Sequence, residues 1–260
     1  MSVAGDDPIA RVRLLLREVP QLDTRVHAAT RQPPAEGSPA AADQDRFDGI
    51  GSYPWVFAGQ VLGVAMDHAE AWVRLFESHG LPQYAHLTLL RATLEAAVTV
   101  RWLISAVTPE GRVAAAVSML EEDLVDWDRL ANSFPGAAAP DHSALYSKVL
   151  GEFRAQVAVS GLQTKRPLST SDRVRDFGVH PGQKTDWIFR MLSAPAHGST
   201  WSVSLGEFGD EVEPLVRGAK TVRVRAHPLL ASNATSIVLA TLTAAVTDFE
   251  RYVGGPRPTI

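Results

Sequence analysis

The chain has 260 residues, of which 45% are hydrophobic and 21% are charged, and its formal net charge is −4. These values are typical of a folded globular protein and exclude a wholly disordered chain. The sequence contains no cysteine, which excludes disulfides, thiolate catalysis and cysteine-ligated metal sites.

The N-terminal residues carry two acids, and no apolar core of the kind that a signal peptide needs follows them. The longest apolar stretches, near residues 87–106 and 237–246, contain charges or are too short to cross a bilayer. We therefore expect a cytoplasmic protein that makes no membrane contact.

Residues 8–18 have an amphipathic pattern behind Asp6 and Asp7, which are suited to cap a helix, and Pro20 is expected to end that helix. Residues 1–30 are therefore predicted to be an N-terminal helical segment. Residues 31–52 contain three prolines and no hydrophobic period, so they are predicted to form a flexible linker.

Residues 53–260 are predicted to form a single all-α domain, an antiparallel helical bundle. Residues 201–226 alternate like strands in two places and predict a small hairpin. The last helix is apolar on most faces, so we expect it to lie at the centre of the bundle. Six to eight helices are expected, the longer ones near residues 54–80, 82–106, 109–132, 141–161, 184–196 and 228–253.

The main candidates for chemistry are Arg190, Ser193 and His197, which are spaced by one and two turns along one predicted helix. A fixed cation beside an imidazole can bind a phosphodiester and transfer a proton without a metal ion. The same spacing also fits a structural role. His197 would then interact with the negative end of the helix dipole, and Arg190 would pair with a neighbouring acid.

Arg91 and Glu95 are four residues apart in the otherwise apolar helix predicted near 82–106. Polar residues in such a helix are costly to bury unless they are paired. They form either an internal salt bridge or part of a polar pocket that also contains Arg190 and His197. Tryptophans occur on both sides of that segment and could wall the pocket, namely Trp187 and Trp201.

An acidic run at residues 121–128 is interpreted as a solvated helix face. With His68 or His86 it could instead form a carboxylate metal site, but the predicted helices contain no Glu-x-x-His motif. We therefore predict no metal ion and no cofactor. A further alternative is that Glu122 or Asp126 pairs with an arginine, namely Arg91, Arg112 or Arg190.

Arg190, six intervening residues and His197 on a late helix resemble the Arg-x(4–6)-His signature of the HEPN superfamily. Ser193 and the segment 89–95 are also similar to uncharacterised bacterial families at the helical edge of that superfamily. The likeness covers about residues 54–200. It implies a helical bundle that forms a homodimer, with the two Arg/His pairs facing one groove. It also implies metal-independent cleavage of RNA, in which Arg190 binds the phosphate and His197 is the general base.

Two functional hypotheses follow from these patterns. The first is a HEPN-like homodimer that binds RNA or cleaves it without a metal ion. The alternative is a helical protein that binds a small molecule or an anion, with or without cofactor-independent chemistry on that ligand. Arg190 and His197 are the catalytic candidates, and the ligand-binding candidates are Arg91, Glu95, Ser193, Trp187 and Trp201.

Overall fold

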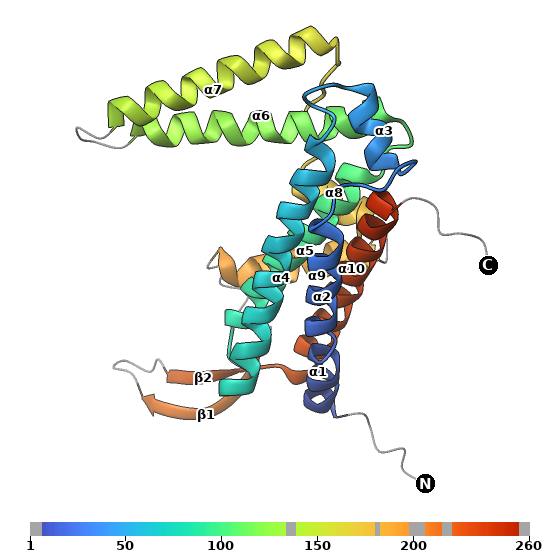
Figure 1. Cartoon of the computed structure of the whole chain (residues 1–260). Coiled ribbons are helices and arrows are strands. Elements are labelled where there is room, and N and C mark those ends of the chain that lie inside the picture. The colour runs from blue at the N-terminus through green and yellow to red at the C-terminus, as the bar shows by residue number, and fades with distance from the viewer. Residues whose placement is uncertain (1–6, 134–138, 180–182, 198–205, 215–219, 255–260) are drawn as a thin grey trace, which may run out of the picture. The chain divides into compact units, whose positions relative to one another are not determined.

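The structure is a computed structural model and describes residues 7–133, 139–179, 183–197, 206–214 and 220–254. Helices dominate this part of the chain, so the predicted all-α fold is confirmed (Figure 1). The described residues form ten helices, more than the six to eight expected: α1 (Pro8–Leu16), α2 (Val19–Thr30), α3 (Pro39–Arg46), α4 (Tyr53–His79), α5 (Ala85–Ile104), α6 (Pro109–Ser133), α7 (Ala139–Ser160), α8 (Thr170–Phe177), α9 (Gln183–Ala196) and α10 (Pro228–Gly254).

The chain divides into two compact units, each assembled from three separate stretches. The range 53–260, predicted to be one domain, contributes to both units, because α4, α5 and α10 each have residues in both. Unit 1 comprises Met1–Ala28, Val61–Val100 and Thr170–Thr247, and unit 2 comprises Ala29–Gln60, Arg101–Ser169 and Asp248–Ile260.

Two short helices form the N-terminal segment. Asp7 caps α1, since its side chain accepts a hydrogen bond from the backbone N–H of Ile9 at 2.9 Å. Pro20 was expected to end helical structure, but it lies in the first turn of α2. A proline is tolerated there because backbone N–H groups in the first turn have no partner within the helix.

The prediction that residues 31–52 form a flexible linker is wrong, because α3 lies within this range. The Ser38 hydroxyl accepts a backbone hydrogen bond at 3.1 Å and caps α3, while Pro39 occupies the first turn. Asp43 and Ile50 are completely buried. The segment is therefore packed into unit 2.

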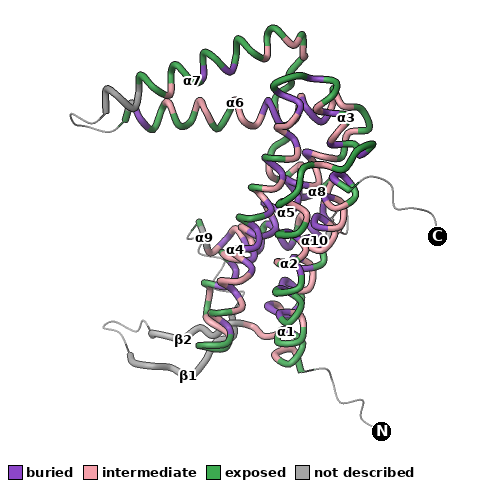
Figure 2. Tube along the Cα trace, viewed as in Figure 1, coloured by how far each residue is buried: buried purple, intermediate pink, exposed green. Residues whose placement is uncertain are grey.

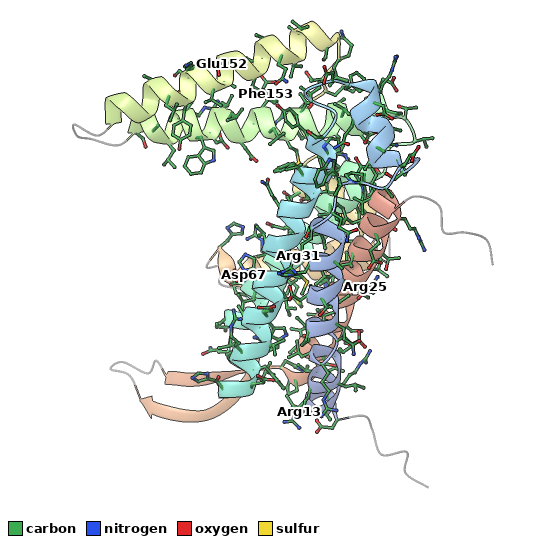
Figure 3. All side chains as sticks on the ribbon, viewed as in Figure 1. Arg13, Arg25, Arg31, Asp67, Glu152 and Phe153 are labelled. Carbon is green, nitrogen blue, oxygen red and sulfur yellow. The ribbon has the colours of Figure 1, made fainter. Side chains whose placement is uncertain are left out.

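The core of unit 2 forms where α3 and the turn after it meet α6 and α7. The helices α6 and α7 lie side by side and antiparallel (Figure 1). On α7, Phe153 lies on the side that faces α6, whereas Glu152 lies on the outer side (Figure 3). The buried members of this core are Phe47, Ile50, Val113, Val117 and Phe153.

In unit 1, Trp72 joins three helices. The Trp72 ring in α4 stacks on His86 of α5, with ring centroids 5.3 Å apart, and its indole N–H donates to Thr235 of α10 at 3.4 Å. Figure 2 shows buried residues running along α4, α5 and α10. All three side chains that make this contact are buried in unit 1.

The helix α10 is longer than the apolar stretch on which the expectation of no membrane segment was based. By length and composition it could cross a membrane, with a mean hydropathy of 1.7 in its most apolar window. More than half of that window (56%) is buried inside the structure. Burial of this kind is also found in core helices of proteins without membrane spans.

The hairpin predicted within residues 201–226 is present as β1 (Gly206–Pro214) and β2 (Lys220–Ala226), which pair antiparallel. The backbone register runs from Gly206 opposite Ala226 to Pro214 opposite Lys220, with two irregularities between Phe208 and Glu213.

Candidate functional site

Four of the predicted site residues line one pocket in unit 1. Arg91 comes from α5, and Arg190, Ser193 and His197 come from α9 and the residue after it. The pocket has a volume of about 520 Å³ and is called the α5–α9 pocket below. Its other lining residues are Thr170, Ser171, Phe189 and Ala194.

The amphipathic pattern of α9 explains why these side chains share one side of the helix. Residues at i, i+3 and i+7 fall on the same face, which gives Arg190, Ser193 and His197 a common direction. The backbone N–H of His197 donates to the carbonyl of Ser193 at 3.1 Å, so the helical turn continues past Pro195. The helix is anchored by buried apolar residues, namely Ile188, Met191 and Leu192.

Arg91 makes three contacts at the pocket. Its Nε donates to Glu95 Oε1 at 2.8 Å, its Nη1 lies 3.2 Å from His197 Nε2, and its guanidinium lies over the Phe189 ring, 5.7 Å from the centroid. A guanidinium can only donate hydrogen bonds, so the contact with His197 is a hydrogen bond in the tautomer whose Nε2 carries no proton.

Arg190 is held by an acid of its own helix. Its Nε donates to Asp186 Oδ2 at 3.0 Å, and its side chain is 74% exposed. This contact is of the kind expected in the structural alternative, in which Arg190 pairs with a neighbouring acid. Among the described residues, neither Nη atom of Arg190 has a hydrogen-bond partner.

The remaining predicted site residues have different positions. The Ser193 hydroxyl donates to the carbonyl of Phe189 at 2.7 Å, which leaves its oxygen able to accept. Glu95 contacts the pocket through Arg91 and is not among the lining residues. Trp187 is 56% exposed on α9 and does not line the pocket. Trp201 lies outside the described residues.

Thr170 and Ser171 were not predicted as site residues. They begin α8. No local pattern shows that this helix lies beside α9. Their hydroxyl groups add hydrogen-bonding capacity to the wall of the α5–α9 pocket.

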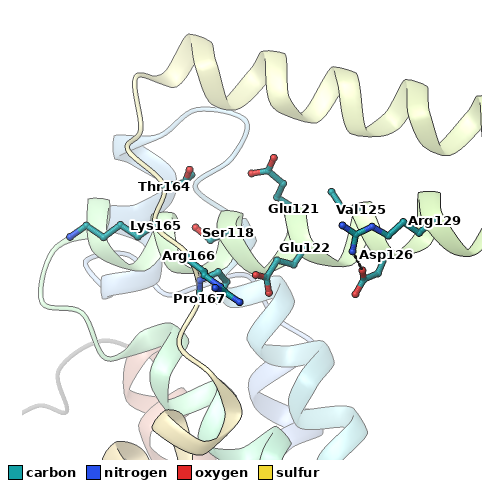
Figure 4. A pocket seen from close by; sticks show the side chains of 10 residues that line it. All are labelled: Ser118, Glu121, Glu122, Val125, Asp126, Arg129, Thr164, Lys165, Arg166 and Pro167. Atoms are coloured by element: carbon teal, nitrogen blue, oxygen red, sulfur yellow. Dashed lines mark hydrogen bonds and ion pairs between the residues drawn. The ribbon is translucent and has the colours of Figure 1, made fainter.

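A second pocket of about 510 Å³ lies in unit 2 between α6 and residues 164–167 (Figure 4). In Figure 4, Glu121 turns toward α7, where it accepts a hydrogen bond from Arg154 at 2.7 Å, and Asp126 pairs with Arg129 at 3.1 Å. Asp126 therefore pairs with Arg129 of its own helix and not with one of the arginines named in the sequence analysis. Within the described residues, no group of three or more His, Asp or Glu side chains is placed to hold a metal ion.

No protein-family model matches the chain, and comparisons with curated proteins and with solved structures found no match. The likeness to the HEPN superfamily therefore stays a prediction from the residues that carry it.

Proposed function

We propose that this protein binds a phosphate group, in the first place a phosphate of RNA, in the α5–α9 pocket. The observation that carries the proposal is that Arg91 and Arg190, from two different helices, line the same pocket. Guanidinium groups match the oxygens of phosphate in a bidentate way and always carry their charge.

The hydrogen bonds around the pocket leave suitable donors for such a ligand. Each arginine holds a carboxylate through Nε, so Arg190 keeps both Nη groups for an anion. Glu95 and Asp186 fix the two guanidinium groups in place, which lowers the entropy that binding must overcome. Thr170 Oγ1 accepts a hydrogen bond from Arg173 at 3.2 Å and can still donate its own hydrogen, and the Ser171 hydroxyl lies at the same wall.

Cleavage of RNA is the second candidate, because Arg190 and His197 lie two helical turns apart and line one pocket. For His197 to act as a general base, its Nε2 must accept the proton of the attacking 2′-hydroxyl group. That nitrogen lies 3.2 Å from Arg91 Nη1. Cleavage would therefore require Arg91 to leave His197 and turn to the phosphate, so binding is the function that the observed geometry favours.

The binding proposal can be tested by the fluorescence anisotropy of a labelled single-stranded RNA with excess EDTA present. We expect Arg190→Ala to weaken binding about tenfold and to reduce the salt slope of log K by about 0.7, the contribution of one phosphate contact. The matched control is Arg175→Ala, which removes an exposed arginine of α8 that pairs with Asp172 and Asp176. Equal affinity of the wild type and Arg190→Ala would disprove the proposal.

Cleavage is tested on the same samples by gel electrophoresis. If the wild type binds the RNA and leaves it intact, the pocket binds RNA without cleaving it. RNA cut by the wild type but not by His197→Ala, at equal melting temperature, assigns cleavage to His197. The resemblance also implies two copies of the chain, and we propose a homodimer, to be measured by light scattering.

A further inference from the structure

Unit 1 contains another hollow, between the C-terminal part of α1 and α4, with a volume of about 480 Å³. It shares no lining residue with the α5–α9 pocket. Its apolar lining residues, called its floor below, are Leu16, Pro20, Val73 and Phe76, and its charged lining residues, called its rim, are Arg13, Arg17 and Glu77. We call this site the α1–α4 hollow.

The floor of the α1–α4 hollow is formed in advance of any ligand. Leu16 and Phe76 are almost fully buried, so neighbouring side chains hold them in place. The volume is in the range of small-molecule sites, which are mostly apolar with a few polar groups that orient the ligand. A hydrocarbon or aromatic group placed on this floor would be removed from water, which is favourable in proportion to the apolar area covered.

The rim carries two arginines four residues apart. In the part of the chain that the structure describes, the side chains of Arg13 and Arg17 have no hydrogen-bond or ion-pair partner, whereas Arg11 donates to Ser236 at 3.5 Å. Figure 3 shows Arg13 on α1. Like charges at this spacing on a helix repel each other. An anion between the two guanidinium groups would replace that repulsion by attraction.

The dipole of α1 explains only part of this arrangement. Cations near the C-terminus of a helix are stabilised by its dipole, and Arg17 is the C-cap residue of α1. That effect accounts for positive charge at the helix end. It does not account for a preformed apolar hollow directly beside two unpaired guanidinium groups.

We propose that the α1–α4 hollow binds an amphipathic anion, a small molecule with one carboxylate and an aliphatic or aromatic body. The carboxylate lies between Arg13 and Arg17, and the body covers Leu16, Val73 and Phe76. Arginine can hold a carboxylate through two parallel hydrogen bonds. Glu77 on the rim disfavours a second negative charge on the ligand, so a monoanion is selected.

Titration calorimetry on the full chain tests the proposal with octanoate below its micelle-forming concentration. We expect saturable binding by the wild type and about tenfold weaker binding by the double variant Arg13→Gln/Arg17→Gln. Arg11→Gln, on the same helix, is the matched control and should bind like the wild type. Acetate tests the carboxylate without the body, octan-1-ol tests the body without the charge, and both should bind more weakly than octanoate.

Three results would overturn the proposal. The first is the absence of saturable octanoate binding, and the second is equal affinity of the double variant or of octan-1-ol. The third is binding of phosphatidylglycerol vesicles that requires Arg13 and Arg17 while monomeric octanoate does not bind. That result would assign the two arginines to a membrane surface.

Discussion

Arg112 of α6 and Asp43 of α3 form an almost completely buried ion pair, with exposed side-chain fractions of 5% and 0% and an Nη2–Oδ1 distance of 2.6 Å. Arg112 also donates through Nη1 to the carbonyls of Ala106 and Val107 at 2.7 and 2.9 Å. The hydroxyl of Tyr252 donates to Asp43 Oδ2 at 2.6 Å. Burial raises the pKa of Tyr252, as does the Asp43 carboxylate, so this hydroxyl keeps its proton and remains a donor.

We predict that Arg112→Ala lowers the free energy of unfolding by about 3–5 kcal/mol, because it leaves Asp43 buried without its cation. The matched control is Arg46→Ala, whose partner Glu110 is exposed. An exposed ion pair contributes at most about 1 kcal/mol. Urea denaturation at neutral pH measures both variants, and similar losses in the two would contradict the prediction.

Two glycines are expected to respond to alanine in opposite directions. A Cβ at Gly51 would overlap the backbone carbonyl of Asp43 and lie 2.7 Å from Gln44 Cα, and backbone atoms cannot move aside cheaply. We predict that Gly51→Ala destabilises by roughly 1–3 kcal/mol, the range of overpacked cores.

Gly63 in α4 is the matched control, because a Cβ there meets nothing within 4 Å. Alanine is a better helix former than glycine, so Gly63→Ala should stabilise by about 0.5–1 kcal/mol. Thermal and urea unfolding of both variants check the signs. A stable Gly51→Ala protein would show that the turn after α3 can shift.

His86 makes stability depend on pH. It is 2% exposed, and its Nδ1 has no hydrogen-bond partner in the described part of the chain. Burial lowers the pKa of His86 to about 4, against 6.5 in an exposed histidine. The unfolded chain therefore takes up a proton near pH 6.5 that the folded protein does not take up until about pH 4. As the pH falls through this window, protonation of His86 stabilises the unfolded state but not the folded state. The free energy of unfolding therefore decreases.

The predicted size of this loss is ~3 kcal/mol between pH 7 and pH 4, from a depression of about 2.5 pKa units. His86→Phe keeps an aromatic ring against Trp72 and should remove this part of the acid sensitivity. His79→Gln, at an exposed position on α4, should retain it. Urea midpoints at both pH values give the comparison, and an identical acid loss in wild type and His86→Phe would refute the assignment.

Helical periodicity was sufficient to place part of the candidate site. A repeat of 3.6 residues puts Arg190, Ser193 and His197 on one face of α9, and it brings Arg91 and Glu95 together on α5. The contact between Arg91 and His197 joins two residues that are 106 positions apart in the sequence. No local pattern encodes such a contact. The sequence therefore left two alternatives open, an internal salt bridge between Arg91 and Glu95 or a polar pocket shared with His197.

The helix α3 shows why the linker prediction failed. Its sequence contains three alanines and one proline and has no stripe of large apolar residues. The side chain that holds it in place, Asp43, is charged. Asp43 is held by Arg112, 69 residues further along the chain, and that partner is not recognisable from the segment itself. The local signal was Ser38 followed by Pro39, an N-cap and first-turn pair that begins a helix.

The last prediction tests whether Arg190 stabilises the fold through its ion pair or binds a ligand. Its partner Asp186 lies on the same helix, and its side chain is 74% exposed. Removing such a pair should change the free energy of unfolding by no more than about 1 kcal/mol. Arg190→Ala is therefore expected to remain folded while RNA affinity falls.

Arg190→Lys is the sharper variant, because lysine keeps the charge but lacks the planar fork that can hold two phosphate oxygens. We expect its RNA affinity to lie between those of the wild type and Arg190→Ala. Asp186→Asn removes a negative charge beside the guanidinium, so it should bind RNA at least as tightly as the wild type. A loss of roughly 3 kcal/mol or more in Arg190→Ala, the size expected for a buried pair, would instead make Arg190 a structural residue and remove the case for binding at this site.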